Sequence, residues 1–519
     1  MKKIFISLAL LACTQMNAQN LADVLRFSQT PLNGSARFTA MGGAFGAVGG
    51  DFSALEINPA GSAIFAFSEA GVTLNTYQLK NSAAYTNVST DDKNQNLNIG
   101  QLGVVLLLNE TTGGGWSKLA FGFTYNKSAD YDRSFVARGN NFNGIDQYFL
   151  LNAEGRLLVD ISRLDDESLQ DAYYDISTVN GLGYSGVQAL LGYEGYVVNP
   201  MPIAGEEPPS DLDPERVNRY SSNAAAGSNG YQHDYYHTSS GQTKKYTFNL
   251  SSSYNDRFFI GLNINSYDLR YSEVVDFYEQ GYSSSSGIQD LRFYNELTTA
   301  GSGGAFQLGM IYKISPKIRV GLTLDSPTYF RLNDRVGQFL ETEVAFENEI
   351  TSYLLDPNVD LILPEYRFIS PGSIRGSFSY IIGERGLISV DYTEKNLSNT
   401  TFRADEFYFN EDLKSFNSLI ENEFTPSTIL QVGGEFRLTP FLSLRAGYIA
   451  EDATLVDFDN SRTVISAGFG YSFGASTLDV SLQMQRFANQ QPLFYTGLID
   501  TVLLSSERNN LRITYRIKL

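Results

Sequence analysis

Two-residue alternation of apolar and polar side chains, repeated many times along 519 residues, most limits what this chain can fold into. In residues 430–438, one face would carry Leu430, Val432, Gly434, Phe436 and Leu438, and the other Gln431, Gly433, Glu435 and Arg437. Successive side chains of a β-strand point to opposite faces, so this pattern predicts a strand with one apolar side. The same rhythm recurs in residues 119–126, 442–448, 478–485 and 511–519.

The spacing of these segments indicates how the strands are connected. About fourteen segments begin near Ser68, Asn96, Lys118, Thr243, Phe258, Gly304, Ile318, Tyr366, Gly386, Ser427, Leu442, Arg462, Thr477 and Asn509. Links after the even-numbered segments are mostly tight, whereas those after the odd-numbered ones are long, roughly 129–242, 271–303, 327–365, 394–426 and 487–508. Short periplasmic turns and long external loops are typical of outer-membrane barrels. A soluble β-sandwich also alternates, but it has no reason to separate short and long links in this way.

We therefore predict an all-β fold, a transmembrane antiparallel β-barrel of about fourteen strands with both termini periplasmic. The aromatic content of 13% and the charged content of only 18% agree with this class. A charge facing lipid near mid-bilayer costs about 2–4 kcal/mol. The arginines within the alternating segments should therefore face the lumen or lie at a rim; they are Arg437, Arg445, Arg512 and Arg516. The net charge of −19 argues against nucleic acid as a partner.

The first residues are typical of an export signal. Lys2 and Lys3 precede an apolar run over residues 4–13, and Ala18 before Gln19 offers a cleavage site, which predicts a signal peptide over residues 1–18. Cys13, the only cysteine, would leave with the signal, so disulfides and thiol catalysis are not expected. The residues before Cys13 loosely resemble a lipoprotein cleavage box, so lipidation is the alternative.

Residues 35–63 follow no alternation and are rich in Gly and Ala, which lets backbone pack closely against backbone. Asp51 or Ser53 could cap one short helical turn, with Glu56 three residues after Ser53. Pro59 should end that turn because it pushes Asn58 out of helical geometry. We predict that residues 19–66 form a hatch that plugs the lumen and that residues 67–519 form the barrel.

Three stretches resemble one known family. Residues 40–61, AMGGAFGAVGGDFSALEINPAG, are similar to the hatch signature of the FadL-type outer-membrane transporters of long-chain fatty acids and other hydrocarbons. Residues 370–380 resemble the family's Pro…Arg-x-Gly…Ser-Tyr strand, and residues 432–448 resemble its C-terminal hairpin. The resemblance implies a monomeric barrel of fourteen strands, closed by an N-terminal hatch.

The resemblance also implies where a ligand passes. It places the hatch residues Asn58, Pro59, Ala60 and Gly61 beside the ligand path, together with the hatch aromatics Phe45 and Phe52. It further implies that residues 19–28 line a ligand pocket, with Leu25 and Phe27 as apolar contacts. The alternative is that all of these residues only pack the plug. A carboxylate head group would favour an inward arginine, for which Arg375 and Arg445 are the candidates, unless they serve as structural partners of lumen acids such as Glu435.

The only two histidines, His233 and His237, are four residues apart. On a helix they could share a metal or haem. Their Gly, Ser, Asn and Tyr neighbours instead predict a solvated external loop, so we expect no metal and no cofactor. A barrel hydrolase would need a histidine beside a nucleophile on the wall, so we do not expect an enzyme.

These observations favour passive uptake of hydrophobic small molecules across a bacterial outer membrane, by a monomer surrounded by membrane lipids. A second hypothesis is an outer-membrane component of type IX protein secretion, which is a branch of the same superfamily. A third is a general porin, which the predicted hatch argues against.

Overall fold

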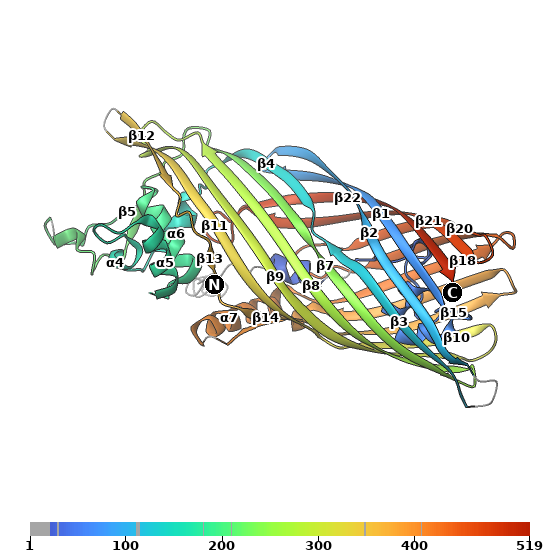
Figure 1. Ribbon diagram of the computed structural model, residues 1–519. Coiled ribbons are helices and arrows are strands. Elements are labelled where there is room, and N and C mark those ends of the chain that lie inside the picture. Colours follow the sequence, from blue (N-terminus) through green and yellow to red (C-terminus); the bar gives the residue numbers. More distant parts are fainter. Residues whose placement is uncertain are drawn as a thin grey trace, which may run out of the picture.

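The computed structural model describes residues 21–28, 31–110, 115–179, 181–208, 210–346, 349–405 and 407–519. The predicted signal peptide lies outside these residues. The described chain forms a long antiparallel barrel with helices at one end, while the C-terminus lies at the other (Figure 1). Among the described residues, no helix is both long enough and apolar enough to cross a membrane.

The wall consists of eighteen named strands. They are β1 (Glu69–Tyr85), β2 (Val88–Glu110), β3 (Trp116–Asp130), β4 (Arg133–Asn141), β7 (Tyr231–Tyr254), β8 (Phe258–Gln280), β9 (Ile288–Lys313), β10 (Ile318–Asp325), β11 (Thr328–Phe346), β14 (Tyr366–Ser370), β15 (Ser373–Ile382), β16 (Gly386–Asn396), β17 (Thr401–Ala404), β18 (Pro426–Arg437), β19 (Leu442–Glu451), β20 (Arg462–Ser472), β21 (Ser476–Pro492) and β22 (Thr501–Lys518). Four barrel strands are interrupted, so each of them carries two names. They are β3 with β4, β10 with β11, β14 with β15 and β16 with β17. Eighteen minus four leaves fourteen barrel strands, and β22 closes the barrel by pairing with β1. Each predicted segment lies in one of the fourteen, which confirms the predicted fold class.

The lipid-facing side of the wall carries an apolar band. Outward residues such as Leu250, Leu262, Phe306 and Leu482 are between 44% and 60% exposed because they face away from the lumen. Beyond the band, away from the short turns, charged side chains take the outward positions; they include Lys80, Asp268, Arg331, Glu394 and Arg486. This change from apolar to charged outward positions indicates where the hydrocarbon layer ends.

Several predicted long loops are wrong, because the strands continue far beyond the band. β8 runs to Gln280 and β9 begins at Ile288, so most of residues 271–303 is strand. In the apolar band the apolar side chains face outward, but in this extension they face inward. Tyr271 and Phe277 face inward and are buried, while Asp276 faces outward. Outward apolar residues therefore indicate only the part of each strand that lies within the band.

Most of residues 129–242 is also ordered. It contains β4, the first half of β7, and the helices α3 (Asp146–Ala153), α4 (Leu158–Ile161), α5 (Leu169–Tyr174) and α6 (Gly183–Glu194). A π-helical turn η3 (Asp175–Val179), a 3₁₀ turn η4 (Ser210–Leu212) and the small ribbon of β5 (Val198–Pro200) and β6 (Tyr220–Ser222) complete the group. We call residues 145–222 the outer cap. Its helices pack through one apolar cluster against inward residues of the strand extensions, including Tyr85, Phe293 and Leu340.

The remaining elements lie toward the same end. β11 forms a hairpin with β12 (Glu349–Leu355) and also pairs with β13 (Leu361–Ile362). The 3₁₀ turn η5 (Leu397–Asn399) and helix α7 (Phe407–Glu423) flank β17, and α7 packs on it.

The N-terminal segment lies inside the barrel as predicted. It contains α1 (Leu21–Ser28), α2 (Ala36–Ala40), and the 3₁₀ turns η1 (Phe52–Glu56) and η2 (Pro59–Ile64). Of the two predicted caps, Asp51 is the one that caps η1, by accepting a 2.9 Å hydrogen bond from the Ser53 amide. Asn58 is extended, with φ −145° and ψ 111°, as expected for a residue before proline. We call residues 31–65 the plug.

Candidate site in the barrel lumen

Wall side chains satisfy the backbone of the plug. Its short turns leave carbonyls without helical partners, and a buried carbonyl needs a donor. Inward side chains supply these donors: Asn249 to the Pro59 carbonyl (2.9 Å), Asn263 to Leu55 (2.8 Å), Gln307 to Glu56 (3.0 Å), Arg375 to Ile57 (3.0 Å), Gln431 to Gly42 (2.9 Å) and Ser466 to Ala40 (3.1 Å). The plug is therefore bound around its circumference by strands that are far apart in sequence.

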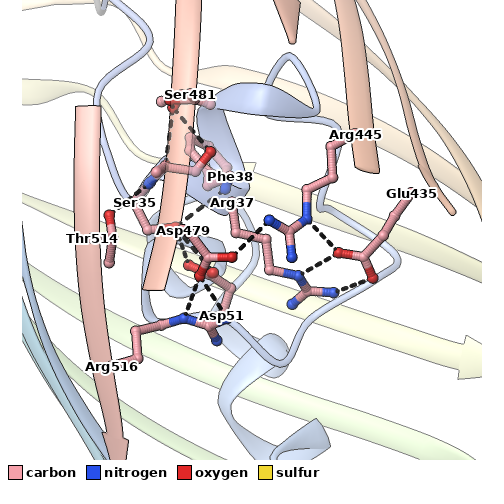
Figure 2. Close-up of polar contacts among 12 residues, drawn as sticks. Ser35, Arg37, Phe38, Asp51, Glu435, Arg445, Asp479, Ser481, Thr514 and Arg516 are labelled. Atoms are coloured by element: carbon pink, nitrogen blue, oxygen red, sulfur yellow. Dashed lines mark hydrogen bonds and ion pairs between the residues drawn. The ribbon is translucent and has the colours of Figure 1, made fainter. Parts of the chain in front are cut away.

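A buried ionic cluster joins the plug to strands β18, β19, β21 and β22 (Figure 2) and extends to β1 through Glu69. Arg37 binds Glu435 through two nitrogens, at 2.9 and 3.1 Å, and Arg445 lies between Glu435 and Asp479 at 2.6 Å from each. Arg516 bridges Asp479 (2.8 Å) and Glu69 (3.1 Å). Three guanidinium groups thus pair with three carboxylates, and a fourth buried carboxylate, Asp51, accepts from the Ser35 hydroxyl beside them.

This cluster bears on the arginine predictions. Arg445 has a side chain only 4% exposed and pairs with Glu435, which is the second of the two roles predicted for it. Arg445, Arg512 and Arg516 all face the lumen, and Arg437 lies exposed beside a short turn at the rim, so that prediction is confirmed.

Glycines on the wall admit the plug at close range. A Cβ atom on Gly309 would lie 2.1 Å from Asn58 Oδ1, and one on Gly447 would lie 2.1 Å from the Gly42 nitrogen. Both distances are below any van der Waals contact, so only glycine fits. The sequence could not show this, because each contact joins residues hundreds of positions apart.

Asn58 links two turns of the plug with the wall. Its Nδ2 donates to the Gly46 carbonyl (2.7 Å) and to the Met310 carbonyl of β9 (3.0 Å), and its Oδ1 accepts from the Ala60 amide (3.1 Å). Asn58, Pro59, Ala60 and Gly61 are all buried. Asn58 therefore couples η2 to residue 46 and to the barrel.

The two hatch aromatics occupy packed positions. Phe45 is fully buried with its ring 5.4 Å from that of Phe38. Phe52 is also fully buried and packs on the backbone of Gly71 and Gly103, where added Cβ atoms would lie 2.6 and 2.5 Å from its ring. These contacts are those of plug packing.

Two chambers lie on either side of α1. The cap-side chamber has a volume of about 220 Å³, and Leu25, Arg26 and Arg133 line it. The plug-side chamber has a volume of about 190 Å³, and Leu32 and Arg375 line it. Pro31, Glu451, Thr454 and Arg462 border both chambers. The chambers thus adjoin each other at the segment that follows α1.

A third cavity, the cap pocket, lies between the outer cap and the wall and has a volume of about 70 Å³. Its lining is mainly aromatic and aliphatic; it includes Tyr148, Tyr184, Tyr235, Leu297, Phe494 and Tyr495. Glu273, which also lines it, contacts Arg26 and His237 of the cap-side chamber. The three cavities therefore form a series along the lumen.

Helix α1 is held by aromatic and ionic contacts. Phe27 makes edge-to-face contacts with Tyr271 (6.2 Å) and Phe368 (5.8 Å). The Arg26 guanidinium lies 3.9 Å from the centre of the Tyr271 ring and 3.1 Å from Glu273. Of the two predicted ligand contacts in α1, Leu25 lines a chamber, whereas Phe27 is 7% exposed and packs against the wall.

The prediction of solvated histidines is wrong. His233 and His237 lie on β7, face the lumen, and are 0% and 3% exposed. His233 contacts Glu279 (2.9 Å) and Tyr85 (2.8 Å) through its two ring nitrogens, and His237 stacks on Phe135 at 4.6 Å. Their polar neighbours alternate with them and occupy the outward face of the strand. Among the described residues, no group of three or more His, Cys, Asp or Glu side chains is placed to hold a metal ion.

No family model matches the sequence, and no curated protein matches it either. Solved structures do match. The chain is similar to the crystal structure of a Pseudomonas aeruginosa FadL homologue, with 11% identity over 94% of this chain and 99% of that one, at a TM-score of 0.53. It is also similar to the Pseudomonas putida toluene transporter TodX, with 12% identity over 95% of this chain and 100% of that one, at a TM-score of 0.50. The chain therefore shares the fold of the FadL- and TodX-type barrels, fourteen strands around an N-terminal plug.

Proposed function

We propose that this protein is an outer-membrane channel for the passive uptake of hydrophobic small molecules, namely long-chain fatty acids or related hydrocarbons. The observation that carries the proposal is the series of cavities from the cap pocket through the two chambers to the plug. Ligand sites are concave, mostly apolar, and carry a few placed polar groups. A protein of the same fold, described as a toluene transporter, supports a hydrophobic cargo.

The lining favours an amphipathic ligand over a pure hydrocarbon. The cap pocket is largely aromatic, whereas the plug-side chamber contains charged groups of both signs. Its cations Lys245, Arg375 and Lys395 lie with the carboxylates Glu56, Asp325 and Glu451, and Lys245 pairs with Glu56. Arg375 already donates to a plug carbonyl, and Lys395 donates to the Ser28 carbonyl at 2.7 Å. A carboxylate that bound either cation would compete for donors that hold the plug and α1 in place.

That competition suggests how binding leads to release. Asn58 couples η2 to residue 46 and to β9, so its bonds must change when the plug moves. We place Asn58, Pro59, Ala60 and Gly61 at the gate, Leu25 in the ligand path, and Arg375 beside the head group. Phe27, Phe45 and Phe52 hold the gate in shape.

The proposed setting is the bacterial outer membrane, with the short turns and the C-terminus on the periplasmic side and a monomer as the working unit. The predicted periplasmic N-terminus falls outside the described residues, of which the first, in α1, lie in the lumen beside Tyr271 of the strand extensions. The plug and the outer cap obstruct the bore, which disfavours a general porin. A component of type IX secretion remains the second candidate, and an enzyme is not proposed.

Mass spectrometry of molecules co-purified in mild detergent tests this function. We expect a bound fatty acid or hydrocarbon, and uptake of a radiolabelled fatty acid by cells that make the protein. Secretion proteins bound in the absence of any lipid would contradict the proposal and favour the second candidate.

A further inference from the structure

A groove is recessed into the outer side of the wall where β22, β1, β2 and β3 lie side by side. Its volume is about 370 Å³. The floor is formed by Ala70, Val72 and Val104, whose side chains are small. Larger side chains rise on either side: Tyr515 and Ile517 on β22, and Phe123 on β3. The outward lining contains no charged residue.

The wall is thin at this place. Gly71 and Gly103 pair across β1 and β2, and both also border the groove. On the lumen side, Phe52 of the plug packs on these two glycines. At these two glycines only one layer of backbone therefore separates the groove from Phe52 of the plug and from the inward side chain of Arg516.

A cation at the rim follows the lining of the groove in the sequence. The groove lies at the end of the barrel that holds the short turns, because Ile517 is two residues from the C-terminus and Ala70 is the second residue of β1. Lys518 follows Ile517, and its Nζ lies 4.5 Å from the centre of the Phe67 ring, which is itself 38% exposed. An apolar groove followed by a lysine at the rim complements an acyl chain that ends at a phosphate.

We propose that this groove binds one acyl chain of a membrane phospholipid, with Lys518 beside the phosphate of that lipid. The groove is continuous with the apolar band and has no access to the lumen, so its occupant comes from the bilayer. The inference rests on the proposed insertion in the membrane and not on the cargo of the channel, so fatty-acid uptake and lipid binding can fail separately.

Tryptophan quenching by a phospholipid with brominated acyl chains tests the site. Trp116, the only tryptophan, is first replaced by Phe. A single tryptophan is then placed in the groove by Tyr515→Trp or, as a control, on the same row of the wall by Tyr471→Trp. Register places both tyrosines opposite Leu478, and they are 45% and 42% exposed.

At a low fraction of brominated phosphatidylglycerol, we expect quenching at position 515 to exceed that at 471 by about twofold, because a retained chain stays in contact with the ring. Val104→Phe fills the groove and should lower quenching at 515 to the level at 471. Lys518→Gln should remove any preference for phosphatidylglycerol over phosphatidylcholine. Equal quenching at 515 and 471, with and without Val104→Phe, would overturn the site, and an unchanged preference in Lys518→Gln would overturn the role of the lysine.

Discussion

Arg37 of the plug binds Glu435 of the barrel wall through two hydrogen bonds, of 2.9 and 3.1 Å, and both side chains are more than four-fifths buried. Arg445 binds the same carboxylate from the neighbouring strand. One wall carboxylate therefore binds a guanidinium of the plug and a guanidinium of the wall. The plug is held here by charge as well as by shape.

Glu435→Gln should loosen the plug while the barrel still assembles. Gln keeps the shape but leaves Arg37 without its carboxylate, and breaking a buried pair in this way costs about 3–5 kcal/mol. Ion leakage through the purified protein in planar bilayers should rise. Asp91→Asn is the control, since Asp91 pairs with Lys80 where both side chains are about half exposed and solvent screens the pair. Equal leakage in both variants would mean that the ionic cluster does not retain the plug.

Gly309→Ala should hinder docking of the plug. The new methyl group would lie 2.1 Å from Asn58 Oδ1, and overpacking of this kind typically costs about 1–3 kcal/mol. We expect faster proteolysis within residues 31–65 of the folded barrel. Gly376→Ala is the matched control, because nothing lies within 4 Å of a Cβ at that position. The close approach of plug and wall would be refuted by two variants that are cut at the same rate.

Asn58→Ala should lower uptake of a hydrophobic substrate several-fold without lowering the amount of assembled barrel. The change leaves two buried carbonyls, those of Gly46 and Met310, without this donor, at a cost of about 1–3 kcal/mol. It also uncouples η2 from residue 46. Asn140→Ala, on the exposed side of β4, should transport normally. Wild-type uptake in Asn58→Ala would remove Asn58 from the gate.

Glu273→Gln should release α1 from the wall. Arg26 would lose a charged partner at 3.1 Å, and a loss of about 1.4 kcal/mol or more corresponds to at least tenfold faster amide exchange. Hydrogen exchange of residues 21–28 measures this, with Glu296→Gln as an outward-facing control on β9. Protection of α1 that survives Glu273→Gln would show that the aromatic contacts of Phe27 are sufficient to hold it.

Local signals in the sequence predict much of the fold. Outward apolar residues indicate all fourteen strands, and Asp51, one of the two predicted caps, precedes η1 because caps act on their immediate neighbours. Pro59, predicted to end that turn, instead begins η2 after η1 has ended at Glu56. The strand extensions give no such signal, because their apolar residues, such as Leu269 and Phe277, face inward instead of outward. The histidines of β7 were misassigned for the same reason.

The candidate site was less predictable, because it is made of contacts between distant residues. A family resemblance indicates Asn58, but it does not indicate the partner Met310, which is 252 positions away. The sequence suggests Glu435 as a partner for Arg445, but it does not indicate that Glu435 also binds Arg37. The sequence around Gly309 and Gly447 does not indicate contact with the plug, because glycine is also common in turns.

The central claim is that hydrophobic molecules pass only when the plug moves, and a reversible lock tests it most directly. Thr39 Oγ1 of α2 and Ser481 Oγ of β21 lie 2.9 Å apart, so Thr39→Cys with Ser481→Cys places two sulfurs for a disulfide between plug and wall. Uptake of a fatty acid is measured in the oxidised protein and again after reduction, with each single variant as a control. We predict that oxidation abolishes uptake and that reduction restores it. Undiminished uptake by the fully oxidised protein would contradict the account.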